Sequence, residues 1–113
     1  MNPSGSAAEA TAVSLLGDAG LRIVARNYSC RHGEIDIIAR DGDTLVFVEV
    51  RSRASDAYGG AAASITAAKR ERLLKTARHY LATLGTVPPC RFDAVLITGR
   101  PPRSEWLRDV IAE

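Results

Sequence analysis

The chain has 113 residues, 46% hydrophobic and 25% charged, a balance typical of one soluble globular domain that needs no disulfide or metal to hold its core. Its formal net charge of +2 is too small to indicate nucleic-acid binding by itself. The two cysteines, Cys30 and Cys90, lack the paired spacing of a zinc ribbon or redox motif, so we expect free thiols in a reducing cytoplasm.

The N-terminal segment does not resemble a signal peptide, because it has no basic region followed by an apolar run. No apolar stretch approaches the roughly 20 residues that cross a bilayer, so we expect a cytoplasmic protein without a membrane partner. Residues 1–5 are rich in Pro, Gly and Ser and are expected to be disordered. Residues 6–19 favour a helix whose apolar residues recur at helical spacing, with Gly20 as its stop.

Three strands are expected next. Residues 21–28 predict the first strand and residues 29–33 a loop. Two further strands, Glu34–Arg40 and Leu45–Arg51, flank the turn signal Asp41-Gly42-Asp43 and should form a hairpin.

The second half of the chain predicts a helix and a strand. Residues 54–64 are small and glycine-rich, which indicates a mobile surface loop, in which Tyr58 could lie over a substrate. Residues 65–84 have the i, i+3, i+4 apolar spacing of a helix packed on a sheet. A strand is expected over residues 91–99, followed by a short element of open type. The order α-β-β-β-α-β predicts a single α/β (α+β) domain with a central mixed sheet flanked by helices.

The predicted hairpin carries carboxylates where buried strands usually carry none. Because side chains alternate across a strand, one face of each strand is mixed: Glu34, Asp36 and Ile38 on the first, and Leu45, Phe47, Glu49 and Arg51 on the second. The opposite faces are apolar and comprise Ile35, Ile37 and Ala39, and Val46, Val48 and Val50.

The turn decides which carboxylates meet. A two-residue turn at Asp41-Gly42 would pair Glu34 with Glu49. A turn at Gly42-Asp43, or a four-residue loop, would pair Asp36 with Glu49. Both registers put the carboxylates on the same side as Arg51, whereas a three-residue loop would break the match.

Two opposed carboxylates need a positive partner. Their Cβ atoms would lie about 4.5–5.5 Å apart, so the charges repel each other, and their apolar neighbours strip hydration. Magnesium and manganese prefer oxygen ligands and often sit on one or two carboxylates plus phosphate oxygens. We therefore expect Asp36 and Glu49 to bind Mg or Mn.

Glu9 is a third candidate ligand. The apolar stripe of the first helix extends backwards to it, so Glu9 begins the buried face and could reach the same site. The alternative is an N-terminal carboxylate stabilised by the helix dipole. Spacing alone does not separate the two.

These residues carry a resemblance. The segments "AEATAVSLL", "GEIDIIARDGDTLVFVEVRSR", "AYGGAAASITAAKRERLLKTARHYL" and "RFDAVLITG" look like the YraN family, an uncharacterised bacterial family. That family resembles the PD-(D/E)XK nucleases, and within them the Holliday-junction-resolvase-like fold. The resemblance implies a restriction-endonuclease-like core and a catalytic site of Glu9, Asp36, Glu49 and Arg51. Related junction enzymes work as dimers, so a homodimer is compatible with it.

One departure from the superfamily pattern matters. Arg51 stands where these nucleases usually have lysine. Arginine stays protonated and cannot act as a base, although it can hold phosphate oxygens in a fork. The electrostatic role therefore survives and the base role does not.

The resulting hypothesis is a Mg- or Mn-dependent endodeoxyribonuclease acting on DNA, with branched or recombination-related DNA as one candidate substrate class. Basic residues follow the site strand and open the second helix; the expected phosphate contacts are Lys69, Arg53, Arg72 and Lys75. Two alternatives stay open. One is a non-catalytic DNA- or protein-binding module on the same fold, and the other is a site in which Asp36 and Glu49 pair with Arg51 and Arg91 without a metal. Asp93 is expected to have a structural role.

Overall fold

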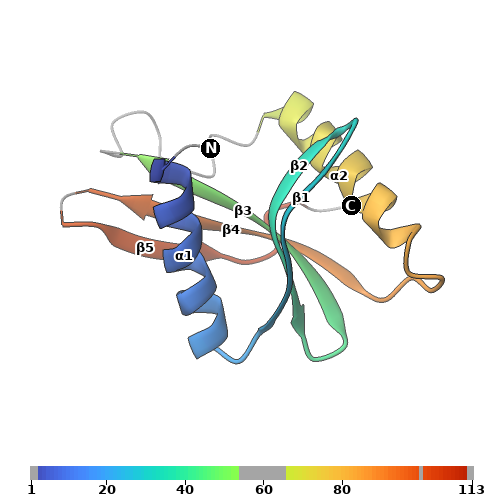
Figure 1. Cartoon of the computed structure of the whole chain (residues 1–113), viewed down its shortest axis with the longest axis horizontal. Helices are drawn as coiled ribbons and strands as arrows, with labels where there is room; N and C mark the ends of the chain where they lie inside the picture. Colours follow the sequence, from blue (N-terminus) through green and yellow to red (C-terminus); the bar gives the residue numbers. More distant parts are fainter. Residues whose placement is uncertain (1–2, 54–65, 100, 112–113) are drawn as a thin grey trace.

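The structure is a computed structural model that describes residues 3–53, 66–99 and 101–111, without the side chains of residues 3–6 and 53. It has two helices and five strands (Figure 1): α1 Pro3–Asp18, β1 Arg22–Cys30, β2 Gly33–Asp41, β3 Thr44–Arg53, α2 Ala67–Leu81, β4 Cys90–Thr98 and β5 Arg103–Leu107. Neither described helix combines the length and apolar character that a membrane crossing requires.

The strands form one mixed sheet in the order β1-β2-β3-β4-β5. β3 and β4 are parallel, because the chain crosses over through α2 between them, and every other neighbouring pair is antiparallel. The predicted α+β class and the α-β-β-β-α-β order are confirmed. The final element, whose type the sequence left open, is the edge strand β5.

Two apolar clusters lie on opposite faces of the sheet, one under each helix. The cluster under α1 is built from Ala8, Ala12, Leu16, Leu21, Ile37, Ala39, Val46, Val48, Val95 and Ile97. The cluster under α2 is built from Ile35, Ile38, Leu45, Phe47, Leu73, Ala77, Phe92 and Ile111. Burial on both faces explains why β3 and β4 are apolar almost throughout.

The β2–β3 hairpin has one of the two predicted registers. Asp41 pairs with Thr44 around a two-residue turn, in which Gly42 has φ 61°. The last pair of the ladder is Ile37 with Val48. One further step along this register sets Asp36 against Glu49, as the Gly42-Asp43 turn requires.

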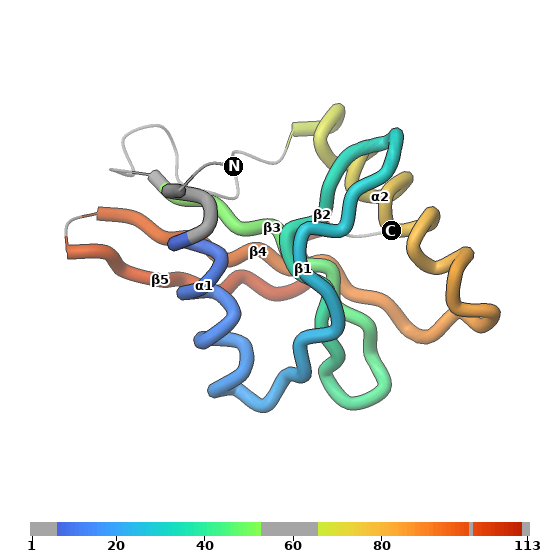
Figure 2. Tube along the Cα trace, viewed as in Figure 1, coloured from blue at the N-terminus to red at the C-terminus, as the bar shows by residue number. Residues whose placement is uncertain are grey.

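The β1–β2 hairpin twists sharply at Asp36. Ile37 lies in the cluster under α1, but Ile35 lies in the cluster under α2, so the prediction that they share a face was wrong. In the facing strand, Asn27 has φ 54°, in the left-handed region that Asn tolerates better than most residues. The tip of this hairpin, in which β1 and β2 still pair, therefore bends away from β3 and ends beside α2 (Figure 2).

Several predicted boundaries shift. α1 begins at Pro3, so residues 3–5 are helical instead of disordered, and β1 runs to Cys30, into the expected loop. α2 begins after Thr66, whose side chain accepts a hydrogen bond of 3.2 Å from the N–H of Lys69. The expected loop at 54–64, with Tyr58, lies outside the described residues.

Asp93 ties β4 to its surroundings. Its carboxylate is 1% exposed and accepts hydrogen bonds from Arg91 Nε and Nη2, from Trp106 Nε1 and from the backbone N–H of Asp109, at 2.9–3.0 Å. Arg91 also contacts Asp41 at 3.1 Å. These hydrogen bonds raise the pKa of the Arg91 guanidinium further. Asp93 therefore has the structural role expected of it.

Candidate functional site

The site lies where β2 and β3 stop pairing. Beyond Ile37 and Val48 the backbone ladder ends, and the next link between the strands is made by a side chain. A carboxylate oxygen of Asp36 accepts a hydrogen bond of 2.8 Å from the N–H of Val50. The carboxylate of Asp36 is thus placed beside Glu49, at the twist described above.

Asp36 is an unusual carboxylate for this position. The pKa of Asp36 is raised to about 6, chiefly by burial and also by the negative charges of Glu49, Glu9 and Glu34, against the lowering effect of the Val50 hydrogen bond. Among the described residues, Asp36 has no ion pair. Because three carboxylates lie near Asp36 and none of the described basic residues pairs with it, a cation bound beside Asp36 would be electrostatically favourable.

Glu49 lies under the first turn of α2. Its side chain is 11% exposed, and Oε1 contacts Lys69 Nζ at 3.1 Å and Arg51 Nε at 3.3 Å. Burial raises the pKa of the Glu49 carboxyl, while the positive charges of Arg51 and Arg72 oppose that shift. Unlike Asp36, Glu49 is already partly neutralised by residues of the chain.

Arg51 leaves one donor unused. The Nε atom is buried and makes no hydrogen bond, although it lies 3.3 Å from Glu49, so the contact is an ion pair without hydrogen-bond geometry. The prediction that Arg51 shares the site face with Glu49 is confirmed. The alternative in which Arg91 also pairs with the site carboxylates was wrong, because Arg91 contacts Asp41 and Asp93.

Glu9 faces the site from α1. The first turn of this helix contains no acidic residue, so the helix-dipole explanation of Glu9 was wrong. Its side chain is 13% exposed, and its Oε1 atom is buried without a hydrogen bond, 3.8 Å from Arg26 Nη2. Its charge contributes to the raised pKa of Asp36, which places Glu9 within electrostatic range of the site.

The predicted phosphate contacts differ in their surroundings. Lys69 contacts Glu49 directly, and Arg72 is exposed one turn further along α2. Lys75 is exposed and lies 3.9 Å from Glu71 in an i, i+4 pair. Arg53 ends β3, and its side chain lies outside the described part of the chain.

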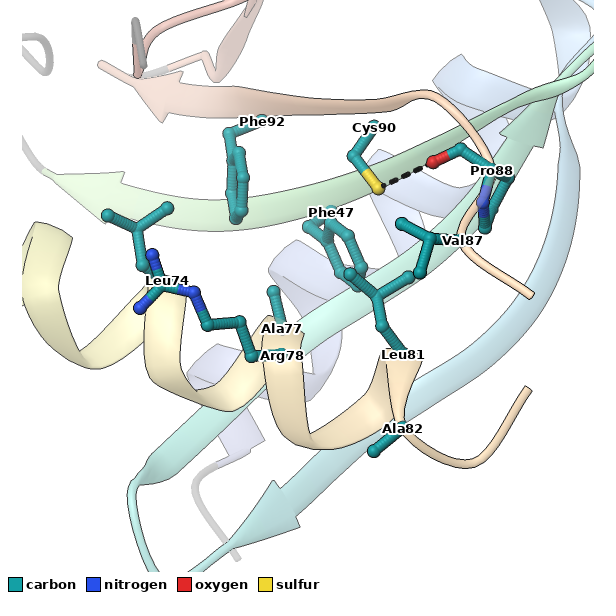
Figure 3. A pocket seen from close by; sticks show the side chains of 10 residues that line it. All are labelled: Phe47, Leu74, Ala77, Arg78, Leu81, Ala82, Val87, Pro88, Cys90 and Phe92. Atoms are coloured by element: carbon teal, nitrogen blue, oxygen red, sulfur yellow. Dashed lines mark hydrogen bonds between the residues drawn. The ribbon is translucent and has the colours of Figure 1, made fainter. Parts of the chain in front are cut away.

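A separate apolar cavity of about 550 Å³ lies between the C-terminal half of α2 and the start of β3 and β4 (Figure 3). Its lining is Phe47, Leu74, Ala77, Arg78, Leu81, Ala82, Val87, Pro88, Cys90 and Phe92. The only polar side chains in this lining are those of Arg78 and Cys90, and the Cys90 thiol donates a hydrogen bond of 3.3 Å to the Pro88 carbonyl. None of the site carboxylates lines it, so the cavity belongs to a different region of the molecule.

Comparison with known proteins identifies the family. Residues 8–97 match the model described as Uncharacterised protein family UPF0102. The chain belongs to the UPF0102 family. It is 57% identical over 110 residues to a UPF0102 protein of Nitrosomonas europaea, covering 96% of this chain and 93% of that one. It is 50% identical over 113 residues to a UPF0102 protein of Methylobacillus flagellatus, covering 99% of each.

A third relative, a UPF0102 protein of Paracidovorax citrulli, is 60% identical over 109 residues, covering 93% of this chain and 79% of that one. These matches confirm the expected YraN-type family. The resemblance to PD-(D/E)XK nucleases stays a prediction.

The acidic groups of this UPF0102 chain suit a hard divalent cation in part. Asp36 and Glu49 supply carboxylate oxygens, the donors that Mg and Mn prefer. Within residues 3–53, 66–99 and 101–111, no three acidic, His or Cys side chains come close enough together to form a complete ligand set. A magnesium site on two carboxylates, completed by water and substrate phosphate, is compatible with that geometry.

Sequence reasoning missed two features of the site. The first is the contact between Lys69 and Glu49, for which a weak signal existed: "ITAAK" offers Thr66 as a cap and puts Lys69 in the first helical turn. The second is the twist opposite Asn27, which turns Asp36 toward β3. The Asn-Tyr pair inside an apolar run gives no reliable sign of it.

Proposed function

We propose that this UPF0102 chain is a metal-dependent nuclease that hydrolyses phosphodiester bonds in DNA, on a fold resembling that of the PD-(D/E)XK enzymes. One observation carries the proposal. Asp36 is a largely buried carboxylate beside Glu49, has a pKa raised to about 6, and lacks a basic partner among the described residues. A divalent cation is the species that satisfies such a pair.

The carboxylates would hold the ion. Asp36 and Glu49 would be the first ligands, and Glu9, whose buried Oε1 makes no hydrogen bond and lies 3.8 Å from Arg26 Nη2, would add negative charge from the α1 side. A bound Mg or Mn ion would lower the pKa of a water molecule and neutralise charge on the phosphate. The Val50 N–H holds the Asp36 carboxylate in place.

The reaction is a hydrolysis without redox change. The attacking water forms a bond from its oxygen to phosphorus and gives up one proton, one P–O ester bond breaks, and the leaving alkoxide takes up that proton by way of solvent water. Arg51 stays charged throughout and cannot remove a proton, so its role is to stabilise negative charge on the phosphate oxygens. Its Nε atom lies 3.3 Å from Glu49 Oε1 and makes no hydrogen bond there.

The DNA backbone would approach over the first turns of α2. Arg72 and Lys75 project from exposed positions there, and Arg53 ends the neighbouring strand. Such contacts to phosphates bind DNA without reading its sequence. The branched or recombination-related substrate class rests on the family resemblance alone.

A second candidate function is a non-catalytic binding module. The contacts of Lys69 and Arg51 with one oxygen of Glu49 favour it, because they neutralise a carboxylate that a metal would need. This candidate predicts salt-dependent DNA binding that survives loss of the carboxylates.

Calorimetric titration with Mn²⁺ tests the proposal. The wild-type chain should show one saturable site at millimolar or lower concentration, and Asp36→Asn should abolish it while keeping an acceptor for the Val50 N–H. Asp43→Asn is the matched control, because Asp43 is an exposed residue in the turn of the same hairpin. A wild-type chain that binds no Mn²⁺ would overturn the proposal.

A further inference from the structure

The Lys69 ammonium contacts the Glu49 carboxylate, which a bound metal ion would also contact. Its ammonium lies 3.1 Å from Glu49 Oε1, and its side chain is only 16% exposed. The first turn of α2 fixes its backbone, since the Lys69 N–H is bonded to the Thr66 hydroxyl. The lysine is therefore placed over the site by a capped helix end instead of projecting freely into solvent.

Two positive groups crowd the same oxygen. Arg51 Nε lies 3.3 Å from Glu49 Oε1 and makes no hydrogen bond there. Glu49 thus has two basic neighbours, whereas Asp36 beside it has none among the described residues. This uneven distribution of charge would be relieved if one basic group moved to a different anion when a cation bound both carboxylates.

Of the two, Lys69 is the group able to move. Its ammonium is a compact charge on a four-carbon stem with three rotatable donors. Arg51 is a rigid fork on β3, and its neighbours in the chain are held in the parallel ladder with β4. A divalent ion on Glu49 would repel the ammonium at 3.1 Å, and a nearby phosphate would attract it.

We propose that Lys69 is an exchanging residue: it neutralises Glu49 in the metal-free site and turns to the reacting phosphate when metal and DNA are bound. This inference rests on the proposed function and deepens it. Lys69 would then provide, from α2, the lysine that the site lacks on β3, where Arg51 stands. Its role is charge stabilisation on the phosphate during hydrolysis.

The exchange predicts that removing the Lys69 ammonium strengthens metal binding and at the same time slows DNA cleavage. In Lys69→Met, a competitor for Glu49 is gone, so the Mn²⁺ dissociation constant should fall by about fivefold, the size expected for losing one partly exposed ion pair. The single-turnover cleavage rate at saturating Mn²⁺ should fall by about 100-fold, as for loss of one transition-state donor. A residue with a structural role alone would not tighten metal binding.

Two further variants complete the test. Lys69→Arg keeps the positive charge. Its metal affinity should equal that of the wild type, and its cleavage rate should recover in part. Arg22→Met, which removes an exposed basic side chain at the start of β1 and outside the proposed site, is the control and should leave metal affinity and cleavage rate unchanged. Far-ultraviolet circular dichroism and urea unfolding show that each variant is folded.

The outcomes separate this inference from the proposed function. If the wild type binds Mn²⁺ and cleaves DNA, but Lys69→Met binds the ion no more tightly or cleaves at the wild-type rate, the exchange is wrong and the nuclease proposal stands. If the wild type neither binds Mn²⁺ nor cleaves, both fail together.

Discussion

The carboxylate of Asp36 accepts a 2.8 Å hydrogen bond from the backbone N–H of Val50 at the point where β2 and β3 stop pairing. A side chain thus replaces the next rung of the ladder. The arrangement keeps a carboxylate beside Glu49 without giving it a basic partner among the described residues. Asp93, by contrast, is surrounded by donors on β4, on β5 and just after β5. The two aspartates should therefore respond oppositely to loss of charge.

Asp36→Asn should stabilise the metal-free protein at neutral pH. The substitution keeps an oxygen for the Val50 N–H and removes a charge that burial disfavours. Since each pKa unit corresponds to about 1.4 kcal/mol, a shift from 3.8 to about 6 gives an upper bound of about 3 kcal/mol. We expect the free energy of unfolding to rise by about 1–3 kcal/mol at pH 7.5, measured by urea denaturation with a chelator present.

The raised pKa of Asp36 also determines how the stability of the folded protein depends on pH. Because the pKa of Asp36 is higher in the folded state, the folded chain binds more protons than the unfolded chain between about pH 4 and pH 6. The contribution of Asp36 to stability is therefore complete below pH 4 and is lost as the pH rises through 6. The advantage of Asp36→Asn should vanish at pH 3.5; a variant less stable than wild type at pH 7.5 would contradict this account.

Asp93→Asn should destabilise the protein strongly. The carboxylate is fully buried, and an amide cannot accept all the hydrogen bonds from Arg91, Trp106 and Asp109. Breaking a buried pair of this kind costs about 3–5 kcal/mol. Urea denaturation at pH 7.5 measures the effect, and a loss below about 1 kcal/mol would show that the network is dispensable.

Gly33→Ala should also destabilise the protein, through α2. Gly33 has φ 146°, and a Cβ there would lie 3.3 Å from Thr76 Oγ1 and 3.8 Å from Arg72 Cβ. We expect a loss of about 1–2 kcal/mol in thermal or urea unfolding. Gly17→Ala is the control: Gly17 lies in α1 with open space around it, so alanine should stabilise by about 0.5–1 kcal/mol. Equal effects at both sites would refute the packing argument.

Local patterns predicted most of the fold. The helical spacing of Ala12 and Leu16, and of Leu73 and Ala77, identified both buried helix faces. The turn signal left two hairpin registers open, and the structure has the one with the Gly42-Asp43 turn. The features that the sequence did not predict depend on tertiary contacts. Thr76 is fully buried in α2, where its hydroxyl bonds to the Arg72 carbonyl, and a polar residue in the helix gives no sign of that from sequence alone.

The sequence named the residues of the candidate site, but it predicted their positions only in part. Alternation along β3 placed Glu49 and Arg51 together, as the structure confirms. The same rule misplaced Ile35, because the twist at Asn27 and Asp36 changes which face a side chain occupies. Lys69 lies twenty residues from Glu49 in sequence. The local pattern therefore places Lys69 only in the first turn of α2, and its contact with Glu49 depends on how α2 docks.

Arg72→Gln should weaken DNA binding and reduce its dependence on salt. Arg72 is exposed on the first turns of α2, where we expect a phosphate contact. Each such contact to duplex DNA contributes about 0.9 to the slope of log K against log salt concentration. Fluorescence anisotropy at several salt concentrations measures this slope. Arg22→Gln, at the start of β1, is the control, and the same change of slope in both variants would count against an α2 interface.

Cleavage of DNA tests the central claim most directly. Wild-type protein and Glu49→Gln, purified in parallel, should be incubated with linear, flapped and four-way DNA in the presence of Mn²⁺. We expect the wild type to cleave at least one substrate, a chelator to stop the reaction, and Glu49→Gln to be slower by at least about 100-fold. Absence of cleavage by the wild type, or equal cleavage by both proteins, would contradict the account.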